Sequence, residues 1–77
     1  MASLIRMPQK GLSEDSAILS KWYVKEGDTV KKGDVVLIIE SMKLMNEVTS
    51  DVDGVVQEIL VKNGDAVEYD QPLMILS

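Results

Sequence analysis

The clearest fold signal lies in residues 35–48, which run VVLIIESMKLMNEV. Residues 35–39 form an apolar, mostly β-branched run, which predicts a buried strand. Apolar and polar residues alternate well enough over residues 44–50 to predict a second strand. Only a tight turn fits between the two runs, and Lys43 lies in it. The stretch therefore predicts a β-hairpin with a lysine at its tip.

The surroundings of Lys43 are unusual for a turn. Polar residues normally occupy such positions, whereas Met42, Leu44 and Met45 surround this lysine. A hairpin lysine is most often a solvated charge, because lysine is seldom buried. Apolar side chains gathered around one amine instead indicate a surface that another molecule recognises.

The rest of the chain alternates short strand-forming runs with turn signals. A polar loop is expected over residues 9–16, and glycine, aspartate and proline mark the later turns. No segment carries a helical period over the roughly 10–12 residues that a helix needs. The pattern predicts an all-β sandwich or barrel, with strands at residues 3–7, 17–24, 29–30, 35–40, 44–50, 55–61, 66–68 and 73–76.

The chain also repeats itself. A shift of 37 positions lays residues 17–40 onto residues 54–77 and aligns Val24-Lys25, Gly27-Asp28 and Val30 with their counterparts in the second half. Two repeats are too few for a solenoid. They predict a pseudo-twofold sandwich in which each half supplies strands to both sheets. Under this symmetry the counterpart of the Lys43 turn is the region where the two chain ends meet. We therefore expect Lys43 and the termini at opposite poles.

Composition excludes several classes of chemistry. The 77 residues suffice for a single domain, here taken as residues 1–77, with a thin core. The absence of cysteine and histidine removes thiol chemistry, the commonest general base and the commonest metal ligand. The net charge is −5 and no basic stripe is present, so nucleic acid is not an expected partner. No apolar run approaches the ~20 residues of a membrane span, and the expected location is cytoplasmic.

Other candidate groups have structural explanations. Glu40 and Glu47 could form an acid–base pair, but solvated surface charge is the expected role of such residues. Asp51 and Asp53 resemble fragments of a calcium loop, although the remaining ligands are not at the required spacing. Trp22 is expected in or beside the core. Met7 and Met74 fall in strand patterns and are also expected in the core.

Residues 40–48 closely resemble the biotin attachment motif of biotin carboxyl carrier proteins, and residues 54–56 and 65–73 resemble the second half of such carriers. Residues 21–34, together with Met7-Pro8 and Gly11-Leu12-Ser13, are similar to the first half of lipoyl domains from 2-oxo acid dehydrogenase complexes. Both families share a barrel-sandwich hybrid, a flattened β-barrel or sandwich of two four-stranded antiparallel sheets, with the modified lysine on a hairpin. Ser41 stands where carriers often have alanine, and the "thumb" insertion of some bacterial carriers is missing.

The resemblance implies a carrier module that is not an enzyme by itself. A biotin protein ligase would join biotin to Lys43 as an amide, and Glu40, Met42, Leu44, Met45 and Glu47 are the candidate recognition residues around it. The biotin would then shuttle carboxyl groups between a biotin carboxylase and a carboxyltransferase. The cofactor would do the chemistry and the protein would present it.

Two alternatives stay open. Lipoate could replace biotin on the same lysine, although lipoyl domains usually carry Asp-Lys-Ala where this chain has Met42-Lys43-Leu44. An unmodified β-sandwich adaptor could instead dock a partner through the apolar tip alone.

Overall fold

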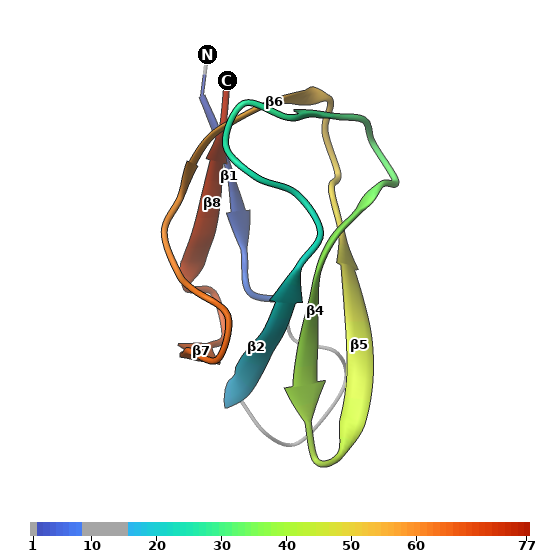
Figure 1. Ribbon diagram of the computed structural model, residues 1–77, viewed down its shortest axis with the longest axis vertical. Helices are drawn as coiled ribbons and strands as arrows, with labels where there is room; N and C mark the ends of the chain where they lie inside the picture. Colours follow the sequence, from blue (N-terminus) through green and yellow to red (C-terminus); the bar gives the residue numbers. More distant parts are fainter. Residues whose placement is uncertain (1, 9–15) are drawn as a thin grey trace.

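The computed structural model describes residues 2–8 and 16–77, and in this part of the chain all regular secondary structure is strand (Figure 1). These residues contain no helix long and apolar enough to cross a membrane. The strands are β1 (Ser3–Arg6), β2 (Ser16–Trp22), β3 (Thr29–Val30), β4 (Val35–Ser41), β5 (Leu44–Thr49), β6 (Gly54–Ile59), β7 (Ala66–Glu68) and β8 (Pro72–Leu76).

The strands form two antiparallel, four-stranded sheets that face each other. One sheet has the order β1-β8-β6-β3 and the other β5-β4-β2-β7. A shift of one repeat converts β2, β3 and β4 into β6, β7 and β8, so the two sheets match strand by strand. Each half of the chain therefore contributes to both sheets. The predicted sandwich and its pseudo-twofold symmetry are confirmed.

The repeated Gly-Asp turns are equivalent in detail. Asp28 Oδ2 accepts a hydrogen bond of 3.0 Å from the main-chain N–H of Lys25, and Asp65 Oδ2 accepts the equivalent bond at 2.9 Å. Gly27 and Gly64 have φ angles of 94° and 90°, which glycine adopts without the steric penalty of a Cβ. The aspartate and the glycine of each repeat therefore fix the same turn conformation, so the repeat in the sequence corresponds to a repeat in the structure.

The core lies between the two sheets. Val36 and Leu37 in β4 are both fully buried although they are neighbours. Strict alternation would expose one of them, but the β4–β5 register shifts between Val35 and Leu37, and such a bulge can turn successive side chains to one face. Met7 and Met74 are buried, and Trp22 packs against the core. The three core predictions are confirmed.

The predicted strand ends differ from the observed ones by a few residues. β2 ends at Trp22 and not at residue 24, and β6 ends at Ile59 and not at residue 61. β2 and β6 end at equivalent points. The N–H group of Tyr23 donates to the carbonyl of Val36 in the neighbouring strand β4, and the N–H group of Leu60 donates to that of Leu73 in the neighbouring strand β8. The loop predicted for residues 9–16 lies outside the described residues, except that Ser16 already begins β2.

The sandwich is elongated, with principal extents of 33 × 21 × 17 Å. The β4–β5 turn lies at one end of the long axis, whereas the start of β1 and the end of β8 lie at the other (Figure 1). The predicted separation of Lys43 from the chain ends is confirmed. A segment joined at either end of the chain would leave the tip unobstructed at the far pole.

Candidate functional site

The hairpin that carries Lys43 has a two-residue turn. Ser41 and Leu44 form the last pair of the β4–β5 ladder, and the register continues back from the tip to Val35 and Thr49. Met42 and Lys43, between the closing pair, have φ angles of 52° and 65°. Positive φ at both central residues defines the type I′ turn, whose twist matches that of the strands. The ladder therefore fixes the backbone of the lysine at the tip.

The residues in the turn are poor formers of this conformation. Type I′ turns favour Asn-Gly and similar pairs, because a side chain in the left-handed region costs about 1–2 kcal/mol per residue. Neither Met42 nor Lys43 is glycine, asparagine or aspartate. Such strain persists only where the surrounding structure imposes it, and it is frequent at functional sites. The tip thus carries side chains that turn stability alone would not select.

The apolar tip residues are exposed as the sequence indicated. Met42, Leu44 and Met45 each expose 57% of their surface, and Lys43 between them is also exposed. Among the described residues, no hydrogen bond or ion pair engages the Lys43 amine. The site is therefore a primary amine within an exposed apolar patch.

The two carboxylates of the motif lie on the outer face of the hairpin. Glu40 pairs with Met45 across the ladder, and Glu47 pairs with Ile38. Glu40 and Glu47 are thus diagonal neighbours, about 7–8 Å apart by sheet geometry. Both are exposed, and in the described part of the chain neither has a hydrogen-bond or salt-bridge partner. The expectation of solvated charges agrees with this placement.

The structure assigns Asp53 a structural contact. Its Oδ1 accepts a hydrogen bond of 2.8 Å from the main-chain N–H of Lys32. No group of three or more acidic residues in the described ranges is arranged to hold a metal ion. The carboxylate at Asp53 therefore connects two turns, as the turn interpretation of residues 51–54 implies.

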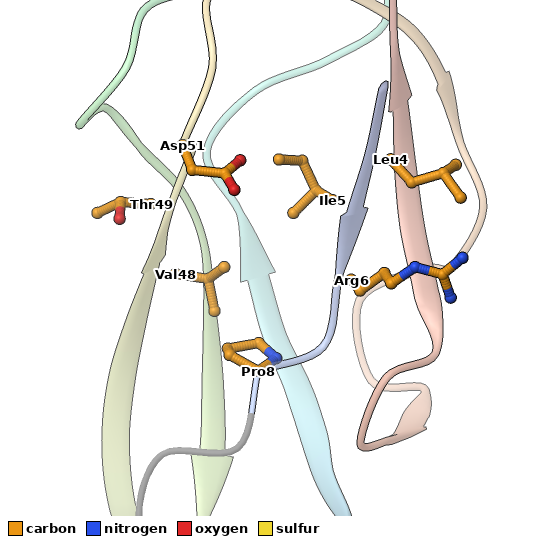
Figure 2. Close-up of a pocket in the computed structure, with 7 residues that line it drawn as sticks. All are labelled: Leu4, Ile5, Arg6, Pro8, Val48, Thr49 and Asp51. Atoms are coloured by element: carbon orange, nitrogen blue, oxygen red, sulfur yellow. The ribbon is translucent and has the colours of Figure 1, made fainter. Parts of the chain in front are cut away.

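Two of the open hollows on the described part of the surface lie near residues of interest. One of them, about 350 Å³, lies between the edge strands β1 and β5, where Ile5 and Pro8 lie on the side of Val48 and Asp51 (Figure 2). It lies away from Lys43, and Arg6 in its wall already donates to the carbonyl of Asp70 at 3.0 Å.

The second hollow, about 300 Å³, borders Lys43 and extends from Glu40 and Met42 to Ile18 and Ala66. Sequence reasoning did not include the last two residues in the site. Strand alternation could have placed Ile18 on the outer face, opposite the buried Ala17 and Leu19. Only the strand order could bring Ala66 beside it.

The arrangement suits covalent attachment of a small group. An exposed amine without a partner can be acylated at Nζ, and the rigid turn keeps it clear of the sandwich. The apolar side chains beside it offer a contact surface to a modifying enzyme. Since the chain has no histidine or cysteine, no nucleophile activated by an imidazole accompanies the amine.

Comparison with known proteins gives one family. The family model described as Biotin-requiring enzyme matches residues 3–76. The biotin carboxyl carrier protein of acetyl-CoA carboxylase from Pseudomonas aeruginosa is 41% identical over 75 residues, covering 96% of this chain and 48% of that protein. The corresponding protein of Nostoc sp. is 60% identical over 52 residues, covering 68% and 29%. The chain thus spans half or less of the length of these relatives.

Solved structures share the fold. The lipoyl domain of the 2-oxoglutarate dehydrogenase complex from Azotobacter vinelandii superposes with a TM-score of 0.77 and 30% identity, over 97% of this chain and 96% of that one. Urea carboxylase from Kluyveromyces lactis matches with a TM-score of 0.82 and 35% identity, over all of this chain and 6% of that one. With a family model that extends over both sheets and the lysine hairpin, the chain belongs to the biotin/lipoyl family described as Biotin-requiring enzyme.

Proposed function

We propose that this chain is a biotin carboxyl carrier module and that Lys43 is its attachment residue. The observation that carries the proposal is the Lys43 amine, exposed at a two-residue turn and without a partner among the described residues. The kinship with carboxyl carrier proteins selects biotin as the group. Residues 1–77 form a single carrier domain in this proposal. The chain presents the group and is not itself the catalyst.

The tip supplies the nucleophile for attachment, and the ligase supplies the activated biotin. Nζ of Lys43 attacks the activated carboxyl group of biotin, an amide bond forms, the activating group leaves, and Nζ loses a proton. Attached biotin supplies the ring nitrogen that carries a carboxyl group. The chain's own contribution is to keep the attachment point fixed on the β4–β5 ladder. Tethering raises the local concentration at each partner's active site, up to the ~mM range for short flexible links.

The partners follow from the proposed reaction sequence. A biotin protein ligase modifies Lys43, a biotin carboxylase loads the carboxyl group, and a carboxyltransferase removes it. The ligase contacts Met42, Leu44 and Met45, whose exposed apolar surface surrounds the amine, and Glu40 and Glu47 on the outer face of the same hairpin. The net charge of −5 favours basic partner surfaces, chiefly through the association rate.

Incubation of the chain with biotin protein ligase, biotin and ATP tests this proposal. We expect the intact mass to rise by one biotinyl group and the product to shift with streptavidin. Lys43→Arg should abolish the modification, whereas Lys62→Arg, which changes another exposed lysine beside a turn, should leave it unchanged. Biotin on the Lys43→Arg variant would contradict the site assignment.

Lipoate is the second candidate, because the solved lipoyl domain matches this chain over nearly its whole length. The tip discriminates between the two groups. The double variant Met42→Asp/Leu44→Ala creates the Asp-Lys-Ala tip usual in lipoyl domains, and we expect it to slow biotinylation and favour lipoate ligase. Modification of the unchanged chain by lipoate ligase, together with no modification by biotin ligase, would replace biotin with lipoate in the proposal.

An unmodified adaptor makes a different prediction. Its partner would bind through Met42, Leu44 and Met45 alone, so binding would survive Lys43→Arg. Loss of carboxyl-carrier activity in that variant, with the fold intact, would exclude this alternative.

A further inference from the structure

The hollow beside Lys43 is formed by residues from three neighbouring strands. Ile18 of β2 pairs with Glu40 of β4 on one side and with Ala66 of β7 on the other. Paired residues point to the same face of a sheet, and all three are exposed. The outer face of the sheet therefore forms one side of the hollow, and the buried residues Ala17 and Ser41, with Met42 and Lys43 of the tip, complete its lining.

From this geometry we infer that the hollow is a resting site for the ring of the group attached to Lys43, on the carrier's own surface. The inference rests on the proposed biotinylation of that lysine. A volume of about 300 Å³ is at the small end of the ~300–1,000 Å³ typical of ligand pockets. That size suits a small bicyclic ring, and the tether makes binding intramolecular.

The chemistry of the lining matches the two sides of the biotin ring. Ile18, with 43% of its surface exposed, and Met42, with 57%, offer apolar contact to the sulfur-containing half. The Glu40 carboxylate has no recorded partner in the described ranges, so it is available to accept hydrogen bonds from the N–H groups of the ureido half. Hydrogen bonds to an ionised acceptor are the stronger kind. The hollow thus has one apolar and one accepting surface.

The tether can reach across the hollow. Ala66 and Glu40 are separated by β2, so they lie two strand spacings apart, about 10 Å. Lys43 begins at the edge of the hollow, and its side chain and the acyl chain of biotin each contribute several bonds of reach. A ring that folds back over Ile18 therefore needs no movement of the sandwich.

The pseudo-twofold symmetry provides a matched control. Val55 is the counterpart of Ile18 under the 37-residue shift and exposes 39% of its surface on the other sheet, but no modified lysine stands beside it. Glu47 is a similar control for Glu40, because it lies on the outer face of the same hairpin and does not line the hollow. Each control changes the same chemistry outside the hollow.

The test uses the biotinylated 77-residue chain, with the modification first verified by intact mass. We expect nuclear Overhauser contacts from the ring to the methyl groups of Ile18 and Ala66. Ile18→Ser and Glu40→Gln should weaken the contact to Ala66, whereas Val55→Ser and Glu47→Gln should preserve both contacts. Capture by avidin should accelerate in Ile18→Ser, by about tenfold if the ring rests in the hollow nine-tenths of the time.

Failure of this inference is distinct from failure of the proposed function. If mass spectrometry finds no biotin on Lys43, the proposed function fails. If Lys43 is fully biotinylated but spectral changes stay within residues 42–44, and avidin captures the parent chain and Ile18→Ser at the same rate, the resting site is refuted and the carrier function stands.

Discussion

Replacing the tip residues with Asn-Gly should stabilise the unmodified chain. The double variant Met42→Asn/Lys43→Gly keeps the two-residue turn and places the preferred type I′ pair at φ angles of 52° and 65°. Relief of left-handed strain at two positions is worth about 2–4 kcal/mol. The greater flexibility of glycine in the unfolded chain reduces this stabilisation by about 0.5–1 kcal/mol. We therefore expect a net gain of about 1–3 kcal/mol in the free energy of unfolding.

Urea unfolding of the unmodified chains, followed by Trp22 fluorescence or circular dichroism, measures this difference. For a chain of this size, each kcal/mol corresponds to a rise of roughly 4–8 °C in the melting temperature. The matched control is Lys32→Gly, because Lys32 is an exposed turn lysine without positive φ. The same change should destabilise the chain there, since glycine adds flexibility and relieves no strain.

The two variants are expected to change the free energy of unfolding in opposite directions, so the test distinguishes strain relief from a general effect of glycine. If Met42→Asn/Lys43→Gly leaves the free energy of unfolding unchanged or lowers it, the tip stores no strain. The Met-Lys pair would then cost the turn no stability, and strain would not indicate that the pair is present for recognition.

Four further substitutions test the fold that carries the tip. Asp28→Ala and Asp65→Ala should each lower the free energy of unfolding by about 1 kcal/mol in urea, since each removes one of the two equivalent turn hydrogen bonds. Clearly unequal losses would show that the two turns share a conformation but not an energetic contribution. Gly54→Ala should cost about 1–3 kcal/mol, because a Cβ there would lie 2.9 Å from the carbonyl oxygen of Ser77; wild-type stability would contradict that close approach. Trp22→Phe should cost about 1–2 kcal/mol in thermal unfolding, since the Nε1–H bond of 3.0 Å to a main-chain carbonyl is lost, and an unchanged melting temperature would show that water replaces the bond without penalty.

The sequence predicts the hairpin and its lysine because both depend on local pattern. The apolar run of β4 and the alternation of β5 leave room for only a tight turn, so the position of Lys43 follows from its neighbours. The internal repeat extends this local information to the whole fold. Because the turns at Gly27 and Gly64 have the same conformation, the strands on either side of them run in the same relative directions in both halves. The separation of Lys43 from the termini then follows from symmetry alone.

Features that depend on register between distant strands are not visible in the sequence. The hollow beside Lys43 exists because Ile18 pairs with both Glu40 and Ala66, and these pairings join residues far apart in the chain. The sequence also hides one pair of equivalent turns. Asp70 has a φ of 70°, and Gly33, its counterpart under the 37-residue shift, has a φ of 95°. Aspartate tolerates the left-handed region better than most residues, so the equivalence is hidden by the change of residue type.

The intact mass and peptide map of the protein isolated from its native host test the central claim most directly. The proposed function predicts one biotinyl group, located on Lys43 and on no other lysine. A lipoyl group on Lys43 would assign the chain to acyl transfer, and an unmodified Lys43 in protein from cells supplied with biotin would contradict the carrier function itself.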